Sequence, residues 1–257
     1  RFAGLYMARP KPLAQVDGCA LLFNERRFDL LEFKDIYLND LSQLPQELTD
    51  FVDTQSPHLS SLNTHVLQLV LLEDRNTRER VLVANSHFFW DPQYDDLKLL
   101  QGYLVLHHVH QFLNSLQFCH HRTDHKSNSS QIHHADHNSN GFHVHHANHN
   151  SNGSHVNHAN HNSNGSRVSV LICGDMNSMP DSAVYELYSK ASVSDKKLQS
   201  LTRLIPIKLK HDFSLQSAYA TRNEPITNIT GKFKGTLDYI WYTQWPTPDA
   251  ANPWSLQ

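Results

Sequence analysis

The sequence lacks several features that would restrict its function. Its 257 residues include three cysteines, Cys19, Cys119 and Cys173, and no C-x-x-C pair. A disulfide framework is therefore not expected, and this cysteine usage fits a reducing compartment, which we expect to be the cytoplasm and also the nucleus. No apolar run approaches the ~18 residues of a membrane-spanning helix, so we expect no membrane partner.

Positive charge is also scarce. The formal net charge is −3 with histidine neutral, whereas proteins that bind nucleic acid over a broad surface are normally basic. If the chain acts on nucleic acid, we expect it to use a local groove and a metal ion rather than a basic face.

Apolar residues make up 39% of the chain, below the average for a compact domain, and the deficit lies in residues 119–167. This low-complexity His/Asn/Ser/Gly segment contains three copies of a 12-residue repeat, the first being HHADHNSNGFHV at His133–Val144. The repeats have few apolar residues to bury, so we expect a disordered insert. Their H-x-x-H pairs suit zinc, copper or nickel, but we prefer an expansion tolerated in an exposed loop.

The insert divides one predicted α/β domain into residues 1–118 and 168–257. Apolar runs of strand length flank charged turns in the first part, and from residue 95 the apolar spacing changes to that of one helix face. The second part predicts a strand, a helix and another strand, and residues 39–63 and 246–257 predict irregular connections. The expected strands are Cys19–Phe23, Phe28–Ile36, a hairpin of Val66–Leu72 with Val81–Ala84, Val168–Ile172 and Leu237–Thr243, and the second helix contains Ala183, Leu187 and Tyr188.

Two candidate metal ligands follow the strand that ends in Gly174. Because side chains alternate along a strand, we expect Asp175 and Asn177 to lie on one side at its end. Carboxylate and amide oxygens are hard ligands that suit Mg²⁺. The alternative is a simple turn, since Asp, Asn and Ser are common turn residues.

Two further candidates adjoin predicted strands. His87 follows the strand Val81–Ala84, where an imidazole could contact a phosphoryl oxygen and stabilise developing charge, although a lone histidine is more often structural. Asp238 lies within an apolar strand, so we expect a buried carboxylate that needs a partner. That partner is either an imidazole that Asp238 orients or a cation in a structural salt bridge.

Read in order, V-A-N-S-H, I-C-G-D-M-N-S and L-D-Y-I-W-Y resemble the motif series of the endonuclease/exonuclease/phosphatase superfamily. The longer strings NSHFFWDPQY, from Asn85, and FKGTLDY, from Phe233, are similar to the carbon-catabolite-repressor type of poly(A) deadenylase. The resemblance covers most of the chain outside the insert and part of 37–63. It implies an α/β fold, a partial four-layer α/β/β/α sandwich interrupted by the disordered His/Asn-rich insert.

The resemblance also implies catalytic roles. Asp175 and Asn177 would bind, or be oriented around, Mg²⁺ and the scissile phosphate. His87 would contact that phosphate, and Asp238 would orient a general-base histidine.

Substrate-binding roles follow from the same resemblance for Asn85, Pro92 and Phe233. Pro92 and Phe233 match positions that sandwich an adenine base in these deadenylases. A proline face and an aromatic ring can stack on a base without reading its edge, so the pairing is physically reasonable. A hydrophobic strand-entry residue is the alternative for Phe233.

Two expected parts of the family's site are absent from the sequence. A metal-ligand Glu, within L-Q-E, would precede Arg1, and the general-base His, within S-D-H, would follow Gln257. His211 precedes Asp238 and cannot replace that histidine by order. We therefore expect a fragment truncated at both ends, poorly stable and with little or no activity alone.

The predicted function is Mg²⁺-dependent 3′–5′ exoribonuclease activity that shortens mRNA poly(A) tails and releases 5′-AMP. The implied partners are single-stranded poly(A) RNA and, for the full-length protein, a deadenylation complex. Three alternatives stay open: a nocturnin- or Angel-like phosphodiesterase or phosphatase of the same superfamily, a degenerate non-catalytic relative that binds RNA or a protein partner, and a His-rich metal-binding protein on an inert scaffold.

Overall fold

The computed structural model describes most of the chain outside the predicted insert. The described residues are 1–9, 17–38, 46, 48–50, 65–120, 168–201, 208–220 and 224–244, with only the helical backbone described for 117–120. The predictions for residues 121–167 and 246–257 fall outside these ranges, as does nearly all of the connection predicted for 39–63.

The strands and helices expected from the sequence patterns are confirmed, including the hairpin, the long helix and the two strands of the second part. The patterns did not indicate β1, α5, β7, β8 or β9, which are short or lie at an edge. In chain order the elements are β1 (Phe2–Ala8), β2 (Gly18–Asn24), β3 (Phe28–Tyr37), β4 (Val66–Asp74), β5 (Arg80–Ser86), α3 (Asp95–His120), β6 (Val168–Asp175), α4 (Ala183–Lys190), α5 (Asp195–Gln199), β7 (Leu215–Ser217), β8 (Asn228–Ile229), β9 (Lys234–Gly235) and β10 (Asp238–Thr243).

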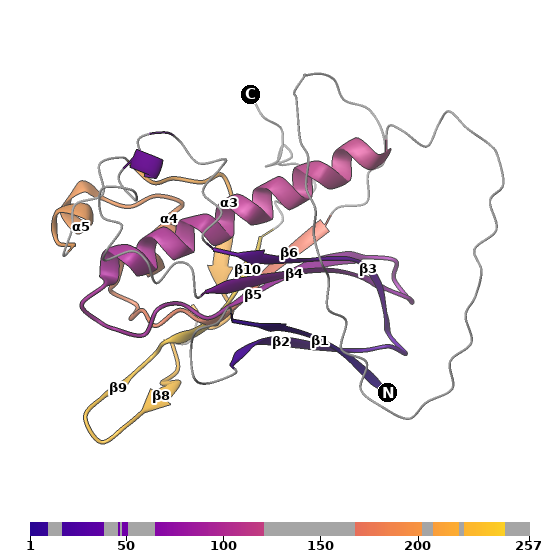
Figure 1. Cartoon of the computed structure of the whole chain (residues 1–257), viewed down its shortest axis with the longest axis horizontal. Coiled ribbons are helices and arrows are strands. Elements are labelled where there is room, and N and C mark those ends of the chain that lie inside the picture. Colours follow the sequence, from indigo (N-terminus) through magenta and orange to yellow (C-terminus); the bar gives the residue numbers. More distant parts are fainter. Residues whose placement is uncertain are drawn as a thin grey trace.

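Six strands form one mixed sheet in the order β3-β4-β5-β6-β10-β7. Neighbouring strands are antiparallel except β5 and β6, which are parallel. The long helix α3 follows β5 in the chain and lies across one face of the sheet (Figure 1). Parallel pairing brings the carboxyl ends of β5 and β6 to the same edge of the sheet, and β10, which is antiparallel to β6, begins at that edge.

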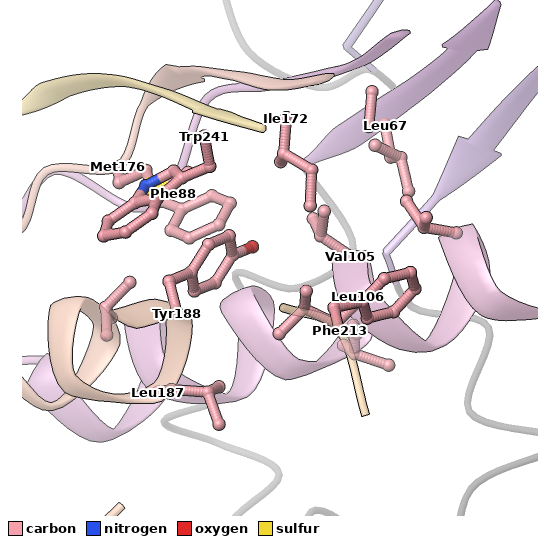
Figure 2. Packing of buried hydrophobic residues seen from close by; sticks show 14 of the residues in the cluster. Leu67, Phe88, Val105, Leu106, Ile172, Met176, Leu187, Tyr188, Phe213 and Trp241 are labelled. Atoms are coloured by element: carbon pink, nitrogen blue, oxygen red, sulfur yellow. The ribbon is translucent and has the colours of Figure 1, made fainter. Parts of the chain in front are cut away.

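The sheet face that carries α3 holds the main hydrophobic core. Because side chains alternate along β4, Leu67 and Leu69 point toward the helix, and both are fully buried. Trp241 of β10 packs against Tyr188 of α4, with ring centroids 5.5 Å apart. Figure 2 shows these two rings beside Phe88 in one continuous cluster. Loss of one such side chain costs about 3–5 kcal/mol, so this face supplies much of the stability.

The opposite face is covered by a second, two-stranded sheet in which β1 and β2 pair antiparallel. Met7 of β1 and Cys19 of β2 pack on Val66 of β4. Enclosed between this hairpin and α3, β4 is buried along its whole length. Farther along the same face, Ile240 of β10 is 39% exposed. Helices, six-stranded sheet and two-stranded sheet account for three layers of the expected sandwich.

Short elements complete the described chain. The hydroxyl of Ser182 accepts a hydrogen bond from the backbone N–H of Tyr185 (3.1 Å) and thereby caps the start of α4. β8 and β9 form a separate hairpin that projects beyond the sheet (Figure 1). None of the described helices combines the length and the apolar character needed to cross a membrane.

Candidate active site

Two acidic residues meet at one edge of the six-stranded sheet. Asp175 ends β6, Asp238 begins β10, and the two are direct partners in the antiparallel register. Directly opposed residues share a sheet face and have Cβ atoms about 4.5–5.5 Å apart. Since Tyr239 and Trp241 of β10 face the helices, both carboxylates lie on the face opposite α3.

His87 lies beside this carboxylate pair, one residue after the end of β5. Its Nε2 is 3.8 Å from Oδ2 of Asp175. Burial lowers the pKa of His87, and the charge of Arg9 lowers it further, while Asp175, Asp17 and Asp238 oppose the change. The lowered pKa favours a neutral imidazole, which keeps one ring N–H for donation to an incoming oxygen.

Asp175 is in an environment that disfavours its negative charge. Burial raises the pKa of Asp175, and the neighbouring charge of Asp238 adds to this effect, whereas His87, Lys98 and the hydrogen bond from Asn177 oppose it. A cation placed near Asp175 would offset both effects, because a nearby opposite charge favours the ionised carboxylate. The electrostatics of this edge therefore suit a positively charged ligand.

The donor set fits a hard divalent cation. Within the described ranges, no group of three or more His, Cys, Asp or Glu side chains could hold a metal alone. Mg²⁺ commonly uses only one or two carboxylates and takes its other ligands from water and substrate phosphates. The carboxylate of Asp175 and the amide oxygen of Asn177 are ligands of the type it prefers, and the negative charge of Asp238 lies beside them.

Asn177 is positioned differently from the sequence prediction. Strand alternation was expected to place it beside Asp175, but β6 ends at Asp175 and Asn177 has a left-handed backbone, with φ 46°. Asparagine tolerates this conformation better than most residues. The Asn177 N–H donates to Oδ1 of Asp175 (2.8 Å), and its Nδ2 donates to the carbonyl of Phe88 (3.0 Å). The turn, rather than the strand, brings Asn177 to the site.

The prediction that Asp238 is buried is wrong, because its side chain is exposed. The apolar residues around it, Leu237 and Tyr239, suggested an interior position. In the structure Tyr239 faces the helical core, while Asp238, at the first position of β10, points to the opposite face. No described element covers the sheet at that point, so the carboxylate does not need a buried partner.

The three expected substrate-binding residues differ in their surroundings. Asn85, on β5, donates from Nδ2 to the carbonyl of Ala20 (3.1 Å) and toward Oε1 of Gln68 (3.4 Å). Its amide nitrogen therefore holds the two sheets together. Pro92 is an exposed turn residue, and Phe233, in the turn between β8 and β9, is 37% exposed. Exposed flat surfaces are what base stacking requires.

Two cations near the site had no predicted role. Arg9 follows β1 and pairs with Asp17 (Nε to Oδ2, 3.4 Å), and its charge acts on His87. Lys98, in the first turn of α3, is buried and donates to the backbone carbonyl of Asn177 (3.0 Å). The sequence signals for Lys98 were its place on the apolar face of a predicted helix and its match to the family resemblance. Arg9 gave none, because β1 was not predicted.

His211, which its position in the sequence already excluded as the general base, has other partners. Its Nδ1 accepts a hydrogen bond from the N–H of Phe213 (3.0 Å), and its Nε2 lies 2.9 Å from the carbonyl of Leu187. Both ring nitrogens are thus engaged in fixing the segment after α5.

The sequence relationships agree with this arrangement. Residues 89–256 match the Endonuclease/Exonuclease/phosphatase family. The chain belongs to that family. It is 30% identical over 255 residues to the CCR4-Not complex 3′-5′-exoribonuclease subunit Ccr4 of Yarrowia lipolytica, covering 94% of this chain and 32% of the relative. The corresponding subunit of Coccidioides immitis is 30% identical over 236 residues, with 89% and 29% covered. The chain thus spans about a third of the length of the curated relatives it matches.

A solved structure supports the endonuclease/exonuclease/phosphatase fold. ANGEL2, described as a 2′,3′-cyclic phosphatase, superposes with a TM-score of 0.56 at 18% identity, over 94% of this chain and 62% of ANGEL2. This likeness concerns the fold, and the predicted fold class is confirmed. In this family member, His87, Asp175, Asn177 and Asp238 lie together at the sheet edge where β5 and β6 end and β10 begins.

Proposed function

We propose that this chain supplies part of the active site of a Mg²⁺-dependent 3′–5′ exoribonuclease that shortens poly(A) and releases 5′-AMP. The main support is the direct pairing of Asp175 with Asp238 beside His87, in a chain 30% identical to a 3′-5′-exoribonuclease subunit. A carboxylate pair next to a neutral imidazole combines cation binding with hydrogen-bond donation to a phosphate oxygen.

Each residue of the candidate site has a separate role in this proposal. Asp175 and Asn177 would hold Mg²⁺, which when bound neutralises the phosphate and assists in-line attack by water. His87 donates a hydrogen bond to a non-bridging oxygen of the scissile phosphate. The exposed carboxylate of Asp238 orients a different histidine, the general base expected after Gln257. That histidine removes the proton from the attacking water.

Recognition of adenine falls to the exposed flat side chains. Phe233 and Pro92 stack on the terminal base, which contributes about 1–3 kcal/mol per base and tolerates different sequences. Lys232 and Lys234 flank Phe233 and are exposed, so they can meet backbone phosphates. A short basic patch of this kind is compatible with a net charge of −3.

The assembly and compartment are proposed on the same basis. The matched relatives are subunits of the CCR4-Not complex, and we propose that the full-length protein joins a deadenylation complex in the cytoplasm. Co-purification with tagged full-length protein and cell fractionation test these two points separately.

The catalytic proposal is tested by sequencing the complete transcript and assaying its product with Mg²⁺ on 5′-labelled oligo(A), oligo(U) and a nucleoside 2′,3′-cyclic phosphate. We expect stepwise shortening of oligo(A), abolished by a chelator. Asp175→Asn should reduce the rate by roughly 10²–10³-fold or more. Asp195→Asn is the matched control, because Asp195 is an exposed carboxylate paired with Lys208 (3.3 Å).

Three results would overturn the proposal. If Asp175→Asn still shortened oligo(A), the carboxylate of Asp175 would not be a ligand of the catalytic metal. Hydrolysis of the cyclic phosphate without oligo(A) shortening would indicate a phosphatase. Oligo(A) binding without cleavage would indicate a non-catalytic relative.

A further inference from the structure

The first two turns of α3 contain three buried polar side chains. Asp96 is 1% exposed, Lys98 6% and Gln101 0%. The leucines that lie between them on the helix pack into the core. Lysine is almost never buried without a partner, since removing its charge from water is costly. Its burial here needs a specific reason.

Lys98 reaches the turn that carries Asn177. Its Nζ donates to the backbone carbonyl of Asn177 at 3.0 Å, across 79 positions in the chain. The N–H of the same residue donates to Asp175, and its side chain donates to Phe88. Three separate segments therefore hold the carbonyl, the N–H and the side chain of Asn177, which fixes its left-handed conformation.

The same helix also holds the segment after His87. Oε1 of Gln101, three residues beyond Lys98, accepts a hydrogen bond from the N–H of Phe89 (2.8 Å). The N–H of Phe88 in turn donates to the backbone carbonyl of Asp175 (2.9 Å). Two site segments that are far apart in sequence are thus tied to each other and to one rigid helix.

Charge explains why the residue is a lysine. Asp91, Asp95, Asp96 and Asp175 all lie near enough for their charges to act on Lys98. An ammonium group balances these carboxylates and also supplies the hydrogen bond to Asn177. An apolar side chain of similar length, such as methionine, could pack in the same space but would do neither.

We propose that Lys98 is a positioning residue that sets the placement of Asn177 relative to Asp175 and His87. It does not touch the substrate, because its side chain is buried behind the turn. The inference rests on the proposed function for its kinetic consequence, but the placement of Asn177 is a property of the fold and can be observed without a substrate. A displacement of about 1 Å in such a site reduces the rate by roughly a hundredfold.

The test compares Lys98→Met with wild-type protein in two ways. In the 257-residue chain labelled with ¹⁵N-asparagine, the side-chain amide signal of Asn177 is assigned through its loss in Asn177→Asp. We expect Lys98→Met to move that signal to the position of a solvent-exposed amide. In the active full-length protein, kcat for oligo(A) should fall about a hundredfold while KM changes less than about threefold.

Lys190→Met is the matched control, because Lys190 is exposed and pairs only with its helix neighbour Glu186 (3.2 Å) among the contacts described. It should leave the Asn177 signal, kcat and KM unchanged. If Lys98→Met does not fold, Lys98→Gln, which keeps an N–H donor, is measured instead and should show a smaller change in the same direction.

An unmoved Asn177 signal in a folded Lys98 variant would overturn the proposal, as would a raised KM with unchanged kcat, which would indicate a substrate contact. Failure of the proposed function is distinguishable: wild-type protein would then not shorten oligo(A), while the amide signal would still report whether Lys98 places Asn177.

Discussion

The two faces of the six-stranded sheet differ in what they carry. The face under α3 is filled by large apolar side chains such as Trp241 and Leu67, which are at most 1% exposed. The opposite face carries Asp175 and Asp238 at its edge and exposes Ile240. Neighbouring residues of a single strand, Ile240 and Trp241, thus belong to two different environments.

This difference separates stability from chemistry within one set of strands. A strand presents alternate residues to opposite faces, so one face can be optimised for packing while the other keeps charged groups that folding alone would not favour. Variants of the two faces should therefore have different effects, and the following predictions run from the largest expected change in the free energy of unfolding to the smallest.

The largest difference is expected between the adjacent residues Trp241 and Ile240. Trp241→Ala removes a buried ring that packs on Tyr185 and Tyr188 and should cost about 3–5 kcal/mol. Ile240→Ala should cost no more than about 0.5–1 kcal/mol, because its side chain is partly in solvent already. Urea unfolding followed by circular dichroism measures both. Equal losses would show that the two faces do not differ in the way described.

Gly174 of β6 lies directly against the backbone of Ser86 at the end of β5. It has φ +144°, and a Cβ at this position would lie 1.8 Å from the backbone oxygen of Ser86. Gly174→Ala should therefore push the two strands apart and destabilise the protein by about 3 kcal/mol.

Gly231→Ala is the control for this substitution, because a Cβ there has no neighbour within 4 Å. Its thermal midpoint should stay close to that of the wild-type protein. A Gly174→Ala variant that melted like Gly231→Ala would contradict the close approach of the strands.

An intermediate effect is expected from pH through His211. Burial lowers the pKa of His211, and its Nδ1 accepts a backbone hydrogen bond, so folding favours the neutral ring. The unfolded chain binds a proton first, near pH ~6.5. The free energy of unfolding should therefore fall as the pH drops below this value, until the folded state is protonated as well.

Thermal midpoints between pH 8 and pH 5 test this linkage. His211→Gln should be less stable than wild type at high pH but should lose less stability on acidification. His87→Gln serves as a comparison, since burial lowers the pKa of His87 too. If the thermal midpoint of His211→Gln fell as steeply at acid pH as that of the wild-type protein, protonation of His211 would not be the cause of the acid destabilisation.

The smallest change, and one of opposite sign, is expected for Asp175→Asn. Because burial raises the pKa of Asp175, the wild-type protein loses stability as pH rises through the folded pKa, and the variant avoids this loss. At pH 7 the variant should therefore be slightly more stable while losing activity, and the two proteins should converge in acid, below ~3.9. A clearly less stable variant at pH 7 would mean that the carboxylate holds the fold.

Much of the fold could be predicted from local sequence patterns. β4, β5 and β10 contain apolar runs of strand length, and apolar residues recur every three to five positions in α3, because each element is packed over most of its length. β1 and the two-residue strands β8 and β9 carry no such signal, because β1 is mostly half-buried and β8 and β9 are too short to show alternation. The patterns therefore found the elements of the core but missed several at the margins.

The candidate site could be predicted in part. His87 and Asp175 come shortly after predicted strands, and the parallel pairing of β5 and β6 brings them together. The exposure of Asp238 could not be predicted, because the strand pattern does not reveal which face is covered. The left-handed turn at Asn177 and its contact with Lys98 depend on the packing of α3 across the strand ends, which is a tertiary property.

The position of the repeat segment has an evolutionary consequence. It joins the end of α3 to Val168, the first residue of β6, whereas Asp175 is the last residue of that eight-residue strand, roughly 23 Å away at ~3.3 Å per residue. Doubling the length of a connection changes its closure free energy by only about 0.6 kcal/mol. Gain or loss of one 12-residue unit should thus change the free energy of unfolding by less than ~0.6 kcal/mol. Alleles that differ only in repeat number are therefore expected to encode proteins of nearly equal stability.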